Sequence, residues 1–427
     1  MNELLQQVRV IDPVSATDRL ADVLIVEGKI AAIAPQITDF PTEIPVRNCQ
    51  GLVLGTGLVD MYSHSGEPGF EERETLRSLM LSAAAGGFTR LAILPDTSPP
   101  SDRPGAIAWL KEQVSQLHHH LPTHQKSSFH FWGALTLGGK GEQMAELADL
   151  VAAGVAGFSD GSPINNLGLL RRLLEYLQPL GKPIAIWPCD RNLVLNGAMR
   201  EGTASIRFGL PGNPTISETA ALAALLEIVA DTQTPVHIMR LSTARSVELM
   251  QIAKERGLPI TASTTWMHVL LDAEAVGSYN PSLHLNPPLG NPRDRIALTQ
   301  GLKSGVIDAI AIDHAPYTYE EKTVAFAEAP PGAIGLELAL PLLWQTLVAT
   351  GEFSALELWR VLSSRPAECL QQIPAAIAPQ QPAELTLFDP NLTWQANRQN
   401  LNSLAANSPW FEQEITGKVI QTWIANC

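Results

Sequence analysis

The stretch EERETLRSLMLSAAAGGFTRLAILPD, residues 71–96, joins a helix pattern directly to a buried-strand pattern. Apolar residues recur at three- and four-residue spacing up to Ala85, two glycines follow, and an apolar run then ends at Pro95. Similar helix–strand units recur about seven or eight times between residues 55 and 370. Strands that alternate with helices form parallel sheets, and this number of units suffices to close a ring. The pattern therefore predicts a (β/α)8 TIM barrel.

Shorter strand-like runs lie on both sides of this region. QVRVID (7–12) and ADVLIVEGKIAAIAP (21–35) precede it, and AELTLFDP (383–390) and GKVIQTWIAN (417–426) follow it. Their alternation of apolar and polar residues is typical of half-buried strands. We predict an α/β chain of two units. Residues 55–374 form the barrel, and residues 1–54 together with 375–427 form a small β-sandwich domain.

Composition narrows the classes of partner. The 427 residues are 45% apolar and carry a formal net charge of −14, without a Lys/Arg cluster, so we expect no nucleic acid partner. The N-terminus lacks signal-peptide features, and no apolar run reaches membrane-spanning length, so we expect a cytoplasmic protein.

The tract His118–His120 is expected in a solvated loop. Four widely spaced cysteines indicate neither a disulfide framework nor a zinc knuckle: Cys49, Cys189, Cys369 and Cys427.

In a barrel of this kind, the residues that follow each strand carry the chemistry. In GLVDMYSHSGEPGF (57–70), the first such segment, Tyr62 and His64 stand where a strand-end zinc site usually has two histidines. The polar or aromatic residues at this and the later strand ends are Tyr62, His64, Glu67, Asp96, Asp160, Trp187, Arg240, His268, Asp313 and His314.

Ordered motifs extend over nearly the whole chain. GLVDMYSHSGEPGF is followed by LSTARSVELM, NPPLG, DAIAIDHAPYTYEEK and AELTLFDP. In this order they resemble the dihydroorotases, which belong to the cyclic amidohydrolases of the amidohydrolase superfamily. The resemblance implies a TIM barrel with a small β domain. It also implies zinc-dependent hydrolysis of a cyclic amide, which interconverts carbamoyl aspartate and dihydroorotate in pyrimidine synthesis.

Several metal ligands that the resemblance implies are replaced here. Three of the family's histidines correspond to Tyr62, Trp187 and Arg240. The metal-capable residues that remain are His64, Asp160 and Asp313. In an active enzyme, Asp313 would also carry the proton to the leaving nitrogen. We therefore expect no cofactor, or at most one weakly bound Zn²⁺.

Arg240 suggests how the barrel does without a metal. Asp160 and Asp313 should both point into its mouth, and unpaired buried carboxylates are costly. A guanidinium carries a permanent charge and a fork that suits carboxylates. We hypothesise that Arg240 replaces the missing cation and pairs with these aspartates.

The substrate carboxylate site is also altered relative to the family. The arginine of the family motif HLREPG is Gly66, the asparagine after the second strand is Asp96, and NPPLR is NPPLG, which ends in Gly290. Losing a guanidinium and gaining an acid turns attraction for an anion into repulsion. Asp96 and Asn286 remain the candidate substrate-binding residues.

Three functions follow from the resemblance. In some bacteria, dihydroorotase homologues that lack the metal histidines assemble with aspartate carbamoyltransferase. The first hypothesis is such a catalytically impaired, homo-oligomeric partner in de novo pyrimidine (UMP) biosynthesis. The second is an active dihydroorotase with one atypical zinc. The third is a hydrolase of another cyclic amide, similar to hydantoinases or allantoinases.

Overall fold

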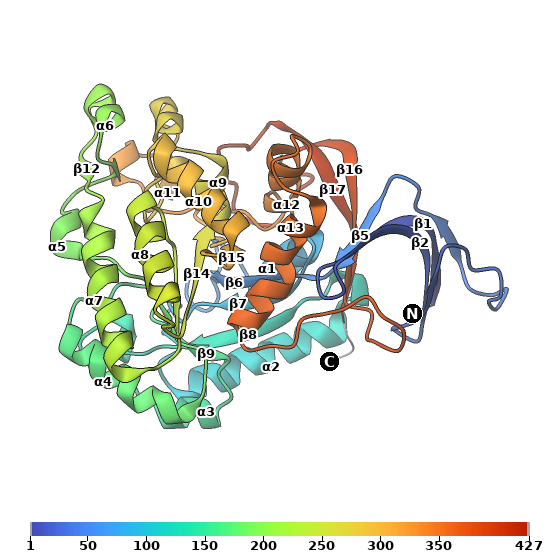
Figure 1. Ribbon diagram of the computed structural model, residues 1–427, viewed down its shortest axis with the longest axis horizontal. Helices are drawn as coiled ribbons and strands as arrows, with labels where there is room; N and C mark the ends of the chain where they lie inside the picture. The colour runs from blue at the N-terminus through green and yellow to red at the C-terminus, as the bar shows by residue number, and fades with distance from the viewer. Residues whose placement is uncertain (1, 425–427) are drawn as a thin grey trace.

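A ring of eight parallel strands forms the larger part of the molecule (Figure 1). The structure is a computed structural model, and it describes residues 2–424. The strands fall into two groups of four, β6-β7-β8-β9 and β10-β13-β14-β15. In chain order they are β6 (Leu58–Ser63), β7 (Phe88–Ile93), β8 (Ser128–Gly133), β9 (Gly157–Phe158), β10 (Ala185–Ile186), β13 (Val236–Ile238), β14 (Ile260–Thr265) and β15 (Ala309–Ala311).

The two groups join at both seams. A parallel bridge between Phe158 and Ile184 connects β9 to β10. At the other seam, the backbone N–H of His64 donates to the carbonyl of His314 at 2.8 Å. The N–H of Ile312 donates to the buried carboxylate of Asp60, also at 2.8 Å. The strands therefore close into the predicted TIM barrel.

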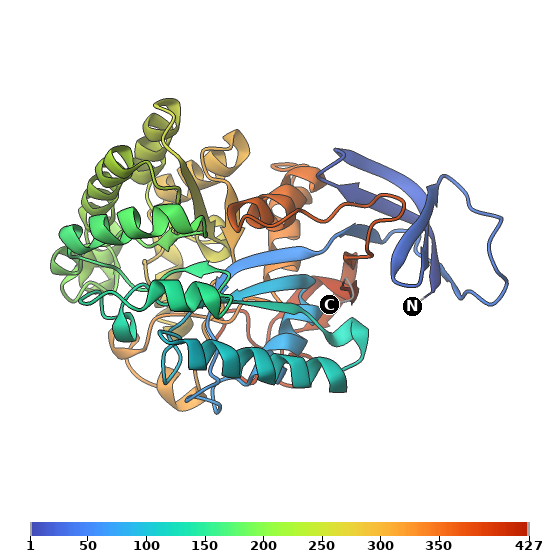
Figure 2. The ribbon, with the colours of Figure 1, turned by 90° about the horizontal axis from the view of Figure 1, so that it is seen from below.

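Helices surround the barrel, as Figures 1 and 2 show. Thr75 caps the first helix by accepting a hydrogen bond from the Ser78 N–H, which explains why that helix starts at Leu76. The outer helices are α1 (Leu76–Ala85), α2 (Pro104–His120), α3 (Leu147–Ala152), α4 (Leu167–Leu177), α7 (Ile216–Thr232), α8 (Ala244–Glu255), α10 (Pro292–Ser304), α12 (Ala339–Leu343), α13 (Ala355–Trp359) and α14 (Arg365–Cys369).

Short elements lie in the connections between strands and helices. One excursion lies between β10 and α7, and the others follow β14 and β15. They are α5 (Arg191–Val194), β11 (Met199–Arg200), α6 (Thr203–Phe208), β12 (Gly212–Asn213), α9 (Trp266–Leu270) and α11 (Tyr319–Lys322).

The His118–His120 tract is helical, so its placement in a loop was wrong. It forms the last turn of α2. The apolar positions Ile107, Leu110 and Val114 pack that helix against the barrel. Leu117 continues the same face to the end of the helix.

Both ends of the chain form one sheet beside the barrel, at the right of Figures 1 and 2. Its main path runs β17-β16-β5-β1-β2-β3, and β4 also pairs with β1. The sheet curves around an apolar core that includes Leu5, Val23, Leu385 and Trp423. Its strands are β1 (Glu3–Asp12), β2 (Thr17–Val26), β3 (Lys29–Ala34), β4 (Val46–Asn48), β5 (Val53–Thr56), β16 (Leu385–Gln395) and β17 (Glu414–Trp423).

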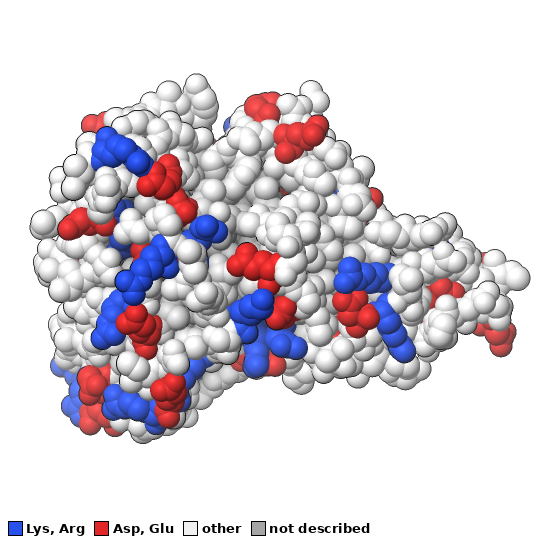
Figure 3. All heavy atoms as spheres, turned by 45° about the horizontal axis from the view of Figure 1, so that its top comes forward, with Lys and Arg blue, Asp and Glu red and all other residues white. Residues whose placement is uncertain are grey.

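Charges of both signs alternate on the face that Figure 3 shows. Exposed ion pairs also occur within the outer helices, such as Arg171–Glu175 in α4 and Arg245–Glu248 in α8. No helix among residues 2–424 is long and apolar enough to span a membrane. Three cysteines in this range have free thiols, whereas Cys427 lies outside the described residues.

Candidate functional site

A bidentate ion pair lies at the mouth of the barrel. Arg240 follows β13 and Asp313 follows β15. The Arg240 Nε donates to Asp313 Oδ2 at 2.8 Å, and its Nη2 donates to Oδ1 at 2.6 Å. Both residues have positive φ, 56° and 52°, a conformation that non-glycine residues adopt only at a cost. The strand ends thus hold both partners in strained backbone positions.

Two aromatic rings enclose the guanidinium. Its central carbon lies 4.9 Å from the centre of the Trp187 ring and 5.6 Å from that of Tyr62. The Arg240 side chain is only 4% exposed. The structure therefore brings together Tyr62, Trp187 and Arg240, the three residues that the resemblance places at ligand positions, in an arginine–aromatic cluster.

His64 extends the cluster toward the surface. Its Nδ1 lies 2.5 Å from Asp96 Oδ2, and its Nε2 lies 3.5 Å from Asp313 Oδ1. Burial lowers the pKa of His64, but the two carboxylates outweigh it and raise this pKa to about 9. Burial likewise opposes ionisation of Asp313, yet Arg240 and His64 hold its pKa well below the usual range. Two cations therefore balance two carboxylates.

We expect this arrangement to make stability pH-dependent through His64. The imidazole has a pKa of about 9 when folded, against 6.5 without its partners. Its stabilisation, on the order of 3 kcal/mol, is complete below pH 6.5 and is lost as the pH rises to about 9. Urea unfolding of wild type and His64→Gln should show their difference shrinking over this range. His120→Gln, on exposed helix surface, is the control. An equal gap at pH 6 and pH 9.5 would contradict the prediction.

Asp160 does not join the cluster. Its carboxylate accepts hydrogen bonds from the Leu135 N–H at 2.7 Å, the Thr136 N–H at 3.0 Å and the Thr136 hydroxyl at 2.6 Å. These three donors satisfy both oxygens. Arg240 Nη1 instead donates to the carbonyl of Gly161 at 2.8 Å. The hypothesis that Arg240 pairs with both aspartates is correct for Asp313 and wrong for Asp160.

The residues at the family's metal positions do not fit a catalytic zinc. Burial raises the pKa of the Tyr62 phenol, which bonds to Ser263 Oγ at 2.8 Å. The indole of Trp187 offers no lone pair, and the Arg240 cation sits beside His64 and Asp313. Within residues 2–424, no three His, Cys, Asp or Glu side chains are grouped to hold a metal. A catalytic zinc needs three protein ligands and a water.

Two further histidines are structural. His237 bonds to Thr261 and Ser263, both at 2.8 Å, and burial lowers its pKa to about 3. His268 bonds to the Thr265 hydroxyl at 2.7 Å, and burial lowers its pKa to about 4. Both rings are therefore neutral near pH 7. His237 links β13 to β14, and His268 links α9 to Thr265 at the end of β14.

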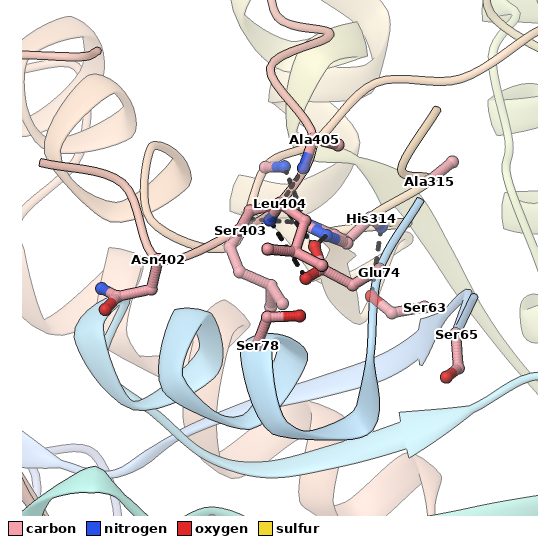
Figure 4. A network of polar contacts seen from close by, with 12 residues as sticks. Ser63, Ser65, Glu74, Ser78, His314, Ala315, Asn402, Ser403, Leu404 and Ala405 are labelled. Carbon is pink, nitrogen blue, oxygen red and sulfur yellow. Dashed lines mark hydrogen bonds and ion pairs between the residues drawn. The ribbon is translucent and has the colours of Figure 1, made fainter. Parts of the chain in front are cut away.

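His314 lies beside Glu74 and the segment 403–405, as Figure 4 shows. The Gly335 N–H donates to its Nδ1 at 3.1 Å, so its Nε2 carries the proton and faces Glu74 at 3.4 Å. The buried Glu74 also accepts from the Ser403 hydroxyl and from the Leu404 N–H. His314 thus anchors the β16–β17 connection rather than lining the site.

The positions of the family's carboxylate clamp leave no room for side chains. A Cβ on Gly66 would lie 2.4 Å from the backbone oxygens of Phe70 and Glu74. A Cβ on Gly290 would lie 2.5 Å from the Cβ of Asp294. Real Cβ atoms do not approach so closely, so a side chain at either position would require its neighbours to shift.

A cavity of about 170 Å³ remains at the mouth. His64, Arg240 and Asp313 contribute to its wall, and Asn286 lines it with an exposed side chain. Tyr317 also lines this cavity, although it was not among the predicted site residues. The only signal for Tyr317 was its position four residues after Asp313.

Known proteins resemble this chain along its length. A family model described as dihydro-orotase-like matches residues 51–246. A "Probable dihydroorotase-like protein" from Synechocystis sp. is 44% identical and is aligned over 97% of this chain and 98% of its own length. A dihydroorotase from Syntrophus aciditrophicus is 37% identical, aligned over 99% and 98%.

Solved structures share the fold. The L-hydantoinase (dihydropyrimidinase) from Arthrobacter aurescens superposes with a TM-score of 0.84 at 21% identity, covering 100% of this chain and 96% of its own. The dihydropyrimidinase from Brevibacillus agri gives a TM-score of 0.81 at 19% identity, covering 99% and 94%. By full-length sequence similarity, and in agreement with its fold, the chain belongs to the dihydroorotase-like family of cyclic amidohydrolases.

Proposed function

We propose that this chain is a dihydroorotase-like protein without hydrolase activity and that it acts as a structural partner of aspartate carbamoyltransferase in pyrimidine biosynthesis. One observation carries the loss of activity: the Arg240 guanidinium binds both oxygens of Asp313. A carboxylate whose pKa is held well below the usual range is a poor proton acceptor near neutral pH. The residue with the proton-transfer role in the family is thus committed to an ion pair.

The residues expected to bind the substrate carboxylate also support the loss of hydrolase activity. Positions 66 and 290 have no space for a guanidinium clamp. The Asp96 carboxylate, 41% exposed, pairs with His64 after the second strand. Both cations of the cluster, His64 and Arg240, are engaged by carboxylates, so neither is free to bind the carboxylate of an anionic substrate.

The partner role is supported by the family resemblance and by the complete barrel and terminal sheet. All eight barrel strands and the sheet built from both chain ends are present. A barrel with its helical faces offers surface for assembly even when its mouth has lost catalytic chemistry.

Metal analysis and dihydroorotate ring opening, measured on the same preparation, test the loss of activity. We expect zinc far below one per chain and no turnover above buffer, with the Syntrophus aciditrophicus relative assayed in parallel. About one zinc per chain with turnover would establish the single-zinc enzyme instead. Turnover of hydantoin or allantoin alone would establish a different cyclic amidase.

Size-exclusion chromatography with the aspartate carbamoyltransferase of the same organism tests the partner role. We expect one co-eluting complex at micromolar concentration. Separate elution would overturn the partner role and leave the assignment of lost activity standing on its own measurements.

A further inference from the structure

Lys322, at the end of α11, is the one buried lysine among residues 2–424, with 9% of its surface exposed. Its Nζ donates to the Pro330 carbonyl at 2.6 Å and to the Pro281 carbonyl at 3.2 Å. No carboxylate in the described part of the chain forms an ion pair with it. A buried ammonium without an anionic partner is unusual, because burying a charge is costly.

The hydrogen bonds of Lys322 suit a neutral amine. An unprotonated Nζ keeps two N–H groups, which are enough for the two carbonyls, and frees one lone pair. Burial lowers the pKa of Lys322 to about 7, and the neighbouring Glu321 only partly opposes this. An ordinary lysine, with a pKa of about 10.4, is neutral in roughly one molecule in a thousand near pH 7.5.

Lys322 lines a cleft of about 500 Å³ that is distinct from the mouth cavity, although Tyr317 borders both. The Nζ lies 5.0 Å from the centre of the Tyr317 ring. Arg398 and Glu412 also line this cleft, with the hydroxyls and amides of Asn280, Ser282, Thr318 and Asn407. A small molecule therefore has room beside the amine, and a cation is present for an anionic group.

Other charged groups near Lys322 are engaged elsewhere. Glu321 is tied to Arg73 through a two-pronged ion pair. His284, whose pKa is lowered by burial and by Lys322, bonds to the Ala329 carbonyl at 2.6 Å. None of these groups neutralises the amine or blocks its lone pair.

We propose that Lys322 is an acylation site for small acyl phosphates. The Nζ lone pair attacks the acyl carbon and forms a C–N bond. The C–O bond to phosphate breaks, phosphate leaves with that electron pair, and the amine releases one proton to solvent. Arg398 binds the phosphate group. The resulting amide keeps a single N–H, so either Pro281 or Pro330 loses its donor. Pro330 adjoins the segment 331–333 that lines the mouth cavity.

Timed labelling of the folded protein with acetyl phosphate at pH 7.5, followed by peptide mass spectrometry, tests the proposal. We expect Lys322 to react at least about tenfold faster than the exposed Lys140, with a rate that levels off above pH 8. The rate at Lys140 should keep climbing with pH. Equal rates at Lys322 and Lys140, or a Lys322 rate that also keeps climbing, would overturn the proposal.

Two variants assign the roles. Lys322→Arg should abolish the fast phase while circular dichroism shows a folded protein. Arg398→Ala should slow labelling by acetyl phosphate several-fold and leave labelling by acetic anhydride unchanged. If Arg398→Ala slowed labelling by both reagents equally, or slowed neither, acyl phosphates would no longer be the favoured class of acyl donor.

Discussion

Replacing Arg240 by alanine is expected to lower the free energy of unfolding by about 3–5 kcal/mol. The variant leaves the Asp313 carboxylate, 16% exposed, without the guanidinium that binds both of its oxygens. His64 remains, but only at 3.5 Å. The Gly161 carbonyl also loses its donor. Urea unfolding at pH 7, followed by circular dichroism, measures the loss.

Variants of both partners separate charge from packing. Arg240→Met combined with Asp313→Asn should recover much of the stability, because neither charge then stays buried alone. Arg245→Ala is the matched control, since it breaks an exposed pair with Glu248 and should cost no more than about 1 kcal/mol. An Arg240→Ala protein that unfolds at the wild-type urea concentration would show that the ion pair does not stabilise the barrel.

The barrel was predictable because its signal is local. Each unit, such as residues 71–96, carries its own helix and strand periodicity, so long-range knowledge was not needed to count units. The limits of short elements were less predictable. β9 and β10 contain two residues each, and their register depends on neighbours far apart in the sequence. The tract His118–His120 was wrongly predicted as a loop because three successive histidines are polar, whereas Leu117 continues the apolar face of α2 to the end of the helix.

Within the site, convergence was predictable and pairing was not. Tyr62 lies near the end of β6, and Trp187 and Arg240 follow β10 and β13 of the same parallel ring, so they had to meet at its mouth. Asp160 also follows a strand, but the segment after β8 offers it two backbone N–H groups and the Thr136 hydroxyl, and no sequence pattern predicts those hydrogen bonds. The His64–Asp96 pair was open to inference, since opposite charges stood at neighbouring strand ends.

Glu74→Ala is the second substitution for which we expect a large loss, about 3–5 kcal/mol. The fully buried carboxylate accepts hydrogen bonds from the Ser403 hydroxyl and the Leu404 N–H, and it faces the His314 ring. A buried donor left without a partner costs about 1–3 kcal/mol. The loss should also be local. Amide hydrogen exchange of residues 403–405, measured by mass spectrometry, should accelerate more than exchange in the barrel strands.

Two comparisons decide whether Glu74 acts through these buried donors. Glu368→Ala removes an exposed carboxylate paired with Arg365 and should change stability by less than about 1 kcal/mol. Glu74→Gln keeps one acceptor oxygen, so it should fall between alanine and wild type. Another buried glutamate, Glu337, also contacts this segment, because it accepts hydrogen bonds from the N–H groups of Asn402 and Ser403 at 2.9 and 3.1 Å. If Glu74→Ala left amide exchange at residues 403–405 unchanged, Glu337 would hold the segment without Glu74. The expected acceleration would instead show that the barrel and the β16–β17 connection are held together through Glu74.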